Sequence, residues 1–290
     1  MRSIIPESEL ILNSDGSIYH LHLLPEDIAD TIILVGDPNR VELVSKYFDK
    51  IEIKKQKREF ITHTGYIGKK RLTVISTGIG TDNIDIVLNE LDALANINLN
   101  TREVNSNPKV LKFIRIGTSG SLQESIPVDS TCISSYGLGL DSLMHFYDYE
   151  EDQHISDLLN HIDEALEMVF INPYLFKAPG NLLQHFGSEF HSGITASCCG
   201  FYAPQGRMLR MYAKYEDILK KLSQIHVSDL FISNFEMETS GIYGLASIMR
   251  HEALSVNAIV ANRINQTFSK HADKTIDNTI QKTLQIISKL

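Results

Sequence analysis

The stretch FYAPQGR, residues 201–207, places an aromatic side chain, an amide and a guanidinium close together along the chain. An amide offers both acceptor and donors and a guanidinium only donors, so Gln205 and Arg207 can read a flat heterocycle that presents both kinds of group. Phe201 could stack on the face of that heterocycle. An ordinary surface turn is the alternative, and on this stretch alone it is favoured, because Pro and Gly punctuate loops and Gln and Arg are usually solvated.

Three arginines stand beside glycine-rich turns or at the ends of predicted strands, where hydroxyls and backbone amides are also available. They are Arg40, Arg58 and Arg115, with hydroxyls at Thr118 and Ser119 and glycine amides at Gly36 and Gly117. Such donors together make a cradle for an oxyanion such as phosphate. A surface salt bridge remains the alternative for each arginine singly. No GxGxxG and no Gly-Lys-Ser/Thr is present, which disfavours dinucleotides and nucleoside triphosphates.

The stretch NFEMETSGIYG, residues 234–244, carries two carboxylates that flank Met237. Alternating residues of an extended segment point the same way, so Glu236 and Glu238 could face one ligand. Carboxylates accept hydrogen bonds from vicinal hydroxyls, which a ribose offers. Acids that complement a helix dipole are the alternative, and these residues alone favour it.

Short β-rich runs alternate with longer amphipathic runs along the chain. Strands are expected at 31–35, 72–76, 112–116, 130–135, 193–197, 230–233 and 256–260, and helices at 41–48, 82–97, 153–170, 208–223, 238–252 and 272–289. This alternation is typical of an α/β sheet with helices on both faces, in which ligands bind beyond the carboxyl ends of strands. The turns VGDPNR, STGIGTDN and IGTSGS follow the first three predicted strands. We therefore expect three glycine-rich loops to converge on one crevice.

Composition sets the broad class of the protein. The chain has 290 residues, 43% of them hydrophobic, and a formal charge of −9, which argues against a nucleic-acid surface. No apolar run is long enough to span a bilayer and the N-terminus lacks a secretory signal, so we expect a cytoplasmic protein without a membrane partner. The three cysteines, Cys132, Cys198 and Cys199, fit no disulfide or metal spacing. Residues 137–192 are the least patterned, and we expect an insertion or a lid there, whereas residues 52–58 are expected to form a solvated edge strand.

Seven motifs together carry a resemblance that none of them carries alone. They are VGDPNRV, KREF, STGIG, RIGTSG, FYAPQGR, NFEMET and a final NR, in this order. With them the chain resembles the nucleoside phosphorylase-I family, and within it the members that act on uridine, from His20 to Arg263. The resemblance implies one domain over residues 1–290, with a three-layer α/β/α fold and a mixed, partly barrel-like central sheet.

The resemblance implies reversible phosphorolysis, in which phosphate and uridine, or a related pyrimidine nucleoside, give ribose 1-phosphate and free base without an organic cofactor. The residues that it implies are Gly36, Arg40, Arg115 and Thr118 for phosphate, Met237 and Glu238 for ribose, and Phe201, Gln205 and Arg207 for the base. Arg207, Arg115 and Glu238 would carry catalysis. Arg58, on phosphate, and His20, on the ribose 5′-hydroxyl, would come from a neighbouring subunit of a dimer, or of a hexamer built as a trimer of dimers.

Three alternative functions remain, namely purine phosphorolysis, nucleoside hydrolysis and nucleoside binding without catalysis. Purine-specific relatives and nucleosidases use an Asp after the last strand, where this chain reads Ala261-Asn262-Arg263. That difference disfavours purine phosphorolysis and hydrolysis. A non-catalytic nucleoside-binding protein is the third alternative, although such a protein would not need phosphate-side arginines. Glu59 matches a position that binds potassium in some bacterial relatives, with a plain surface carboxylate as the alternative.

Overall fold

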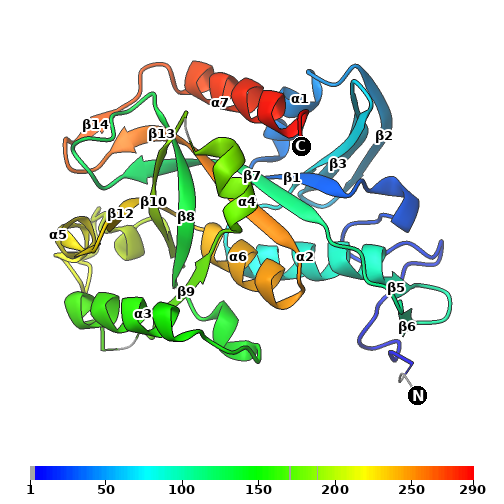
Figure 1. The fold of residues 1–290 in the computed structure, drawn as a ribbon, viewed down its shortest axis with the longest axis horizontal. Helices are drawn as coiled ribbons and strands as arrows, with labels where there is room; N and C mark the ends of the chain where they lie inside the picture. Colours follow the sequence, from blue (N-terminus) through cyan, green and yellow to red (C-terminus); the bar gives the residue numbers. More distant parts are fainter. Residues whose placement is uncertain (1–3, 170, 188) are drawn as a thin grey trace.

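A computed structural model describes residues 4–169, 171–187 and 189–290, and its centre is a 12-stranded mixed sheet (Figure 1). The strands follow the order β11-β12-β10-β8-β13-β7-β1-β4-β3-β2, with β9 on β8 and β14 on β13. Their bounds are β1 Thr31–Val35, β2 Lys50–Lys57, β3 Phe60–Ile67, β4 Lys70–Ser76, β7 Lys112–Ser121, β8 Thr131–Leu140, β9 Tyr174–Lys177, β10 His191–Cys198, β11 His226–Val227, β12 Leu230–Glu236, β13 Glu252–Asn262 and β14 Thr267–Phe268. Two short strands, β5 Ile97–Asn98 and β6 Glu103–Val104, pair separately.

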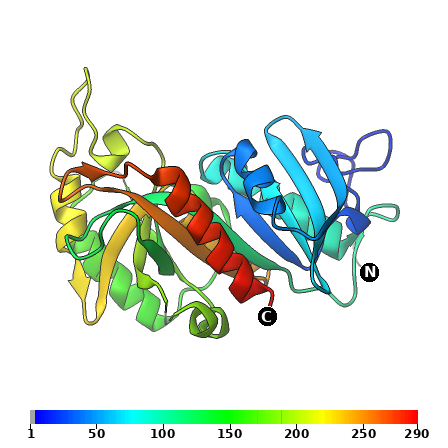
Figure 2. The ribbon, with the colours of Figure 1, turned by 90° about the horizontal axis from the view of Figure 1, so that it is seen from above.

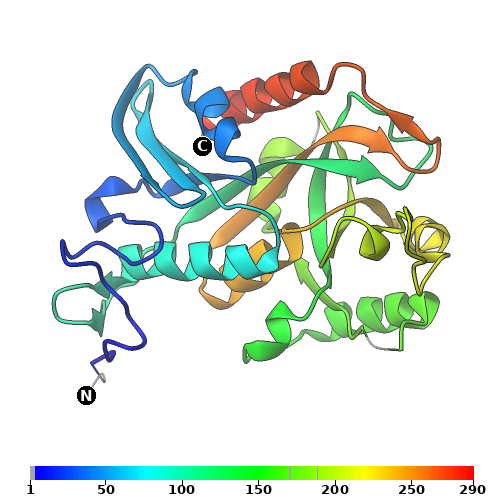
Figure 3. The ribbon, with the colours of Figure 1, turned by 180° about the vertical axis from the view of Figure 1, so that it is seen from behind.

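Helices cover both faces of the sheet, as the alternating pattern predicts. Their bounds are α1 Pro38–Ser45, α2 Thr81–Asn96, α3 Gln153–Leu166, α4 Gly180–Phe186, α5 Ile218–Gln224, α6 Thr239–Ile248 and α7 Ala272–Ile287. In Figure 3, α1 and α7 lie above the sheet and α2 and α6 lie below it. Asp37 caps α1, because its side chain accepts a hydrogen bond from the Asn39 amide, and Pro38 occupies the first turn.

Five strands of the sheet close into a barrel. Strand β7 pairs with β13 along its length, and its far end pairs with β12 through Ser121 and Gly120 opposite Asn234 and Phe235. The pairings β13–β8, β8–β10 and β10–β12 complete the circle. The expected mixed, partly barrel-like sheet is confirmed, and we call β7, β13, β8, β10 and β12 the barrel.

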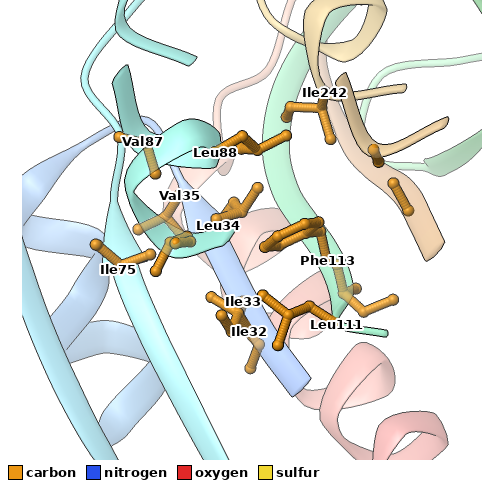
Figure 4. Packing of buried hydrophobic residues seen from close by; sticks show 14 of the residues in the cluster. Ile32, Ile33, Leu34, Val35, Ile75, Val87, Leu88, Leu111, Phe113 and Ile242 are labelled. Carbon is orange, nitrogen blue, oxygen red and sulfur yellow. The ribbon is translucent and has the colours of Figure 1, made fainter. Parts of the chain in front are cut away.

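The main hydrophobic core lies around β1. All five residues of this strand are buried, which is typical of a parallel strand covered on both faces. Figure 4 shows Ile32, Ile33, Leu34 and Val35 surrounded by apolar side chains from β4, α2, β7 and α6. In α2, every third or fourth residue is buried, namely Ile84, Val87, Leu88, Leu91 and Leu94. This core fixes the carboxyl ends of β1, β4 and β7 relative to one another.

The predicted strands are all present, but two other predictions were wrong. The stretch IGTSGS is not a turn after a strand ending at 116, because β7 continues to Ser121 within the barrel. The predicted helix at 208–223 is reduced to α5, which begins only at Ile218. The preceding loop projects from the body in yellow-green (Figure 2) and leaves Leu209 80% exposed, so it has no apolar surface to pack against.

Two further segments have a clear place in the sheet. Strand β2 pairs only with β3 and ends the strand order, which confirms the solvated edge strand predicted at 52–58. Residues 137–192 include α3, β9 and α4, and β9 pairs with β8 through Tyr136–Gly139. Among the described residues, none of the helices is long and apolar enough to cross a membrane.

Candidate active site

One cavity of about 720 Å³ gathers residues from all three glycine-rich stretches. VGDPNR contributes Gly36 and Arg40, STGIGTDN contributes Gly78, Ile79 and Asn83, and IGTSGS contributes Thr118, Ser119 and Gly120. The opposite walls come from FYAPQGR and NFEMET, through Phe201, Gln205, Arg207, Glu236, Met237 and Glu238. The convergence expected from the sequence is therefore confirmed, although the third stretch arrives as a strand.

Glu236 and Glu238 both line this cavity but have different surroundings. Glu236 accepts hydrogen bonds from the Ser197 hydroxyl at 2.6 Å and from the backbone amides of Glu238 and Thr239 at 3.0–3.1 Å. These amides begin α6, so Glu236 complements the helix N-terminus, as the helix-dipole alternative predicts. Glu238 accepts from the Gly80 amide at 2.9 Å and from Arg115. Its carboxylate keeps unused acceptor positions, so it can accept from ligand hydroxyls.

Arg115 is buried between the two carboxylates. Its Nη2 lies 2.8 Å from Glu236 and 2.5 Å from Glu238. Burial alone would lower the pKa of this guanidinium, but the two carboxylates raise it above its ordinary value. Burial also raises the pKa of Glu238, an effect that Arg115 opposes. A Cβ at Gly117 would lie 1.9 Å from the Arg115 guanidinium, so the glycine makes room for it.

Arg40 is also buried, but it has almost no partners. In the described part of the chain, the Arg40 guanidinium donates one hydrogen bond, from Nη1 to the Ile116 carbonyl at 3.3 Å. Its buried Nε has no hydrogen-bond partner there. Burial lowers the pKa of this guanidinium, and the nearby Arg115 lowers it further. A buried cation without a compensating anion is costly, and the cost is removed when an anion binds beside it. Arg40 thus marks an anion site on the cavity wall.

The FYAPQGR loop presents its amide and guanidinium in fixed orientations. Gln205 is buried and donates from Nε2 to the Glu236 carbonyl at 3.2 Å, while its Oε1 accepts from Arg207 Nη1 at 2.6 Å. The Arg207 guanidinium lies 3.7 Å from the centre of the Phe201 ring, which is a cation–π contact. Burial lowers the pKa of Arg207 to about 10, with a smaller effect of Arg263, so Arg207 is protonated at neutral pH.

Arg263 was not among the predicted site residues, yet it supports this loop. Its Nη1 donates to the Gln205 carbonyl at 3.1 Å and its Nη2 to the Gly206 carbonyl at 3.4 Å. Its guanidinium lies 5.5 Å from the centre of the Phe235 ring, and Phe235 lines the cavity. The sequence signal was the NR pair itself, which was used for the resemblance but not for a role.

His20 and Arg58 lie outside the cavity of their own chain. His20 is anchored by Glu90, which accepts from its backbone amide at 2.9 Å and approaches its Nδ1 at 2.6 Å. Arg58 is exposed in the turn between β2 and β3, and its guanidinium lies 5.9 Å from the centre of the Tyr19 ring. Tyr19 also contacts His20, with the ring centres 4.8 Å apart. The two residues expected to serve a neighbouring subunit therefore share one surface region.

Glu59 lines the cavity as an exposed carboxylate. Across the described residues, no cluster of three or more His, Cys, Asp or Glu side chains is arranged to hold a metal ion. A potassium contact at Glu59 stays a prediction.

The barrel, the anion site and the FYAPQGR loop together point to one class of protein. A family model described as the Phosphorylase superfamily matches residues 30–290, and the chain belongs to this family. It is 30% identical to the uridine phosphorylase of Thermococcus kodakarensis and 28% identical to that of Haemophilus influenzae, over 94% of this chain and 88% and 96% of those proteins. A crystal structure of a Trypanosoma brucei nucleoside phosphorylase that shows uridine phosphorylase activity superimposes with a TM-score of 0.90 at 27% identity, covering 97% of this chain and 100% of that one.

Proposed function

We propose that this protein is a pentosyltransferase that cleaves uridine with inorganic phosphate. The observation that carries the proposal is the cavity that brings together Arg40, whose buried Nε has no hydrogen-bond partner among the described residues, the Glu238 carboxylate and the Gln205–Arg207 pair. Arg40 suits phosphate, Glu238 suits the ribose hydroxyls, and the Gln205–Arg207 pair suits a base with adjacent donor and acceptor groups. The likeness to uridine phosphorylases supports the same assignment.

In the reaction, a phosphate oxygen attacks C1′ of the nucleoside and forms the C1′–O bond. The bond from C1′ to N1 of uracil breaks, and its electron pair leaves with the base. Phosphate is held by Arg40 and Arg115 with Gly36 and Thr118, and Glu238 with Met237 covers the ribose. The uracil anion takes the proton that hydrogen phosphate gives up, so neutral uracil is released and the ribose 1-phosphate dianion remains. No organic cofactor is required, and a potassium ion beside Glu59 is part of the proposal.

The FYAPQGR loop faces the base and stabilises the leaving group. Breaking the glycosidic bond spreads negative charge over the uracil carbonyl oxygens, so a fixed cation there acts more strongly on the transition state than on the ground state. Arg207 is that cation, and Phe201 holds its guanidinium from one side at 3.7 Å. Gln205 pairs with the N3–H and a carbonyl of uracil.

Purified protein is expected to release uracil from uridine only when phosphate is present, with ribose 1-phosphate formed in equal amount. A parallel assay with inosine distinguishes a purine phosphorylase from a uridine phosphorylase. An assay without phosphate distinguishes hydrolysis from phosphorolysis. Chromatographic measurement of free base decides among these. Release of hypoxanthine from inosine with uridine left intact would contradict the pyrimidine assignment, and no turnover of either would favour a nucleoside-binding protein.

The proposed assembly is a homodimer, alone or as the unit of a hexamer, in which each subunit completes the site of the other. On the phosphate side of the cavity, Arg115 is paired with Glu236 and Glu238, so among the described residues Arg40 is the cation there that makes no ion pair. A phosphate dianion needs a further cation there. Arg58 of a neighbouring subunit supplies it, and His20 reaches the ribose 5′-hydroxyl from the same exposed region.

If the sites are shared between subunits, mixing two inactive variants should restore activity. Arg58→Ala and Arg207→Ala are each inactive alone, but a mixed dimer collects both lesions in one site and leaves the other intact. About half of randomly re-formed dimers are mixed, so activity should return to about a quarter of wild type. Differently tagged chains verify that subunits exchange. Exchange without recovered activity would show that Arg58 serves its own subunit.

The cysteines support a reducing compartment, and we place the protein in the cytoplasm. Cys132, Cys198 and Cys199 are all free, and Cys199 is exposed. An exposed thiol next to a second cysteine persists in reducing surroundings rather than in an oxidising one.

A further inference from the structure

A chain of hydrogen bonds between buried side chains runs around the barrel. It begins at one residue of β7, passes through one residue of each of the other four barrel strands and ends at a second residue of β7. The links are Asn234 Nδ2 to Ser119 Oγ at 2.9 Å, Thr195 Oγ1 to Asn234 Oδ1 at 2.9 Å, Ser134 Oγ with Thr195 Oγ1 at 2.6 Å, Asn257 Nδ2 to Ser134 Oγ at 3.1 Å, and Arg115 Nη1 to Asn257 Oδ1 at 2.6 Å. Each link joins two neighbouring strands (Figure 1). We call this set the barrel hydrogen-bond chain.

Both ends of the barrel hydrogen-bond chain lie on the cavity wall. Ser119 and Arg115 belong to β7, and both line the cavity. The four members between these ends, Asn234, Thr195, Ser134 and Asn257, are fully buried. A buried polar network of this kind is stabilising only when its members are satisfied, and then it holds each member in one orientation. The orientation of Arg115 is thus set from within the barrel as well as from the cavity.

Asn257 is the member that contacts Arg115. Its Nδ2 donates to Ser134 Oγ and to Ser255 Oγ, at 3.1 and 3.3 Å, which directs its Oδ1 toward Arg115 Nη1. The other contact of Nη1 is with Ser255 Oγ at the longer distance of 3.4 Å. Nη2 meanwhile is drawn to two carboxylates. Asn257 therefore opposes a shift of the guanidinium toward Glu236 and Glu238.

We propose that Asn257 is a positioning residue that holds the Arg115 guanidinium in the orientation that binds phosphate. A neutral amide suits this role, because it accepts from Arg115 without adding a third negative charge to the cavity. The proposal rests on the proposed function only in taking phosphate as the anion that Arg115 meets. Asn257 itself reaches the reacting groups through Arg115 alone.

The test replaces Asn257 by Leu, which has a similar shape and no acceptor. The KM for phosphate is expected to rise at least about tenfold, which corresponds to about 1.4 kcal/mol. The kcat at saturating phosphate and the KM for uridine should stay within about threefold. Asn257→Ser, whose shorter side chain cannot reach Nη1, is made as well in case the Leu variant fails to fold, and the same rise is expected.

Thr195→Val is the matched control for barrel stability. It breaks the chain at a residue that contacts Asn234 and Ser134 but not Arg115. Its melting temperature should fall, while its KM for phosphate stays at the wild-type value. An unchanged KM in the Asn257 variants, or an equal rise in Thr195→Val, would overturn the positioning role.

Failure of the proposed function would be visible in the wild type, as absence of phosphate-dependent uracil release. In that case a crystal structure of Asn257→Leu decides the present proposal. A displaced Arg115 guanidinium supports it, and an unmoved one overturns it.

Discussion

Arg207→Ala is expected to lower kcat/KM for uridine by about 100- to 1,000-fold, the usual cost of removing one donor that stabilises developing negative charge. The fold should stay intact, because Arg207 lies in a loop, and Phe201 and Gln205 of that loop accept the hydrogen bonds that its side chain donates within the described structure. Steady-state kinetics with varied uridine measures the loss, and circular dichroism checks the fold.

Two variants of the same loop calibrate this result. Arg210→Ala removes an equal charge from an exposed position and should keep kcat/KM near the wild-type value. Gln205→Ala should cost less than Arg207→Ala, because a neutral hydrogen bond is worth about 0.5–1.5 kcal/mol net. Wild-type turnover of uridine by Arg207→Ala would refute the assignment of this loop to the base.

Arg40→Met is expected to have opposite effects on activity and stability. The change removes a buried cation that makes no ion pair with the described residues, so the KM for phosphate should rise about 100-fold. The melting temperature should increase, because an apolar side chain of similar length avoids the cost of burying that charge. Phosphate-saturation kinetics and thermal unfolding without phosphate measure the two effects.

Arg115→Met provides the contrast to Arg40→Met. Arg115 neutralises Glu236 and Glu238, so its loss leaves two buried carboxylates without their cation and should destabilise the protein by about 3–5 kcal/mol. Both variants weaken phosphate binding, but their melting temperatures should move in opposite directions. Equal destabilisation by the two changes would show that Arg40 has a structural partner after all.

Most of the fold is visible in the sequence, because the strands differ from the helices in period. The apolar run TIILV is short and rich in β-branched residues, as expected of a buried strand, whereas the spacing of Ile84, Val87, Leu88 and Leu91 matches the helical period. The prediction of a turn at IGTSGS was wrong because the small residues there belong to strand β7 of the barrel, which needs them for close contacts. Gly117 makes room for Arg115, and Ser119 bonds across to Asn234. A pattern of neighbouring residues in the sequence cannot reveal contacts between residues that lie so far apart along the chain.

The loop before α5 shows the opposite error. Met208, Met211 and Tyr212 recur at helical spacing, but the structure leaves all three exposed. A periodic apolar face forms a stable helix only when another surface covers it.

Site residues could be predicted where they stand in stretches whose composition indicates binding. Residues that act only by supporting other residues could not be predicted. Arg40 and Gln205 stand in stretches whose composition points to binding, and both line the cavity. Arg263 acts through backbone carbonyls far away in the sequence, so only the folded chain shows its contacts. Asn257 gave a weaker signal, as a single amide inside the apolar run VNAIV. A lone polar residue in a buried strand needs a partner, and here that partner is Arg115.

The closure of the barrel between β7 and β12 also bears on how the protein is made. Strands β1 to β4 and β7 can pair while the chain is still leaving the ribosome, but β13, which covers the remaining edge of β7, is synthesised more than a hundred residues later. Until then a nascent chain carries an unpaired strand edge, a feature that promotes aggregation and recruits chaperones. Contacts between segments so distant in the sequence also slow folding. The cavity of each subunit is therefore completed late, when the C-terminal strands, which contribute Val260, Ala261 and Phe268 to its wall, reach β7.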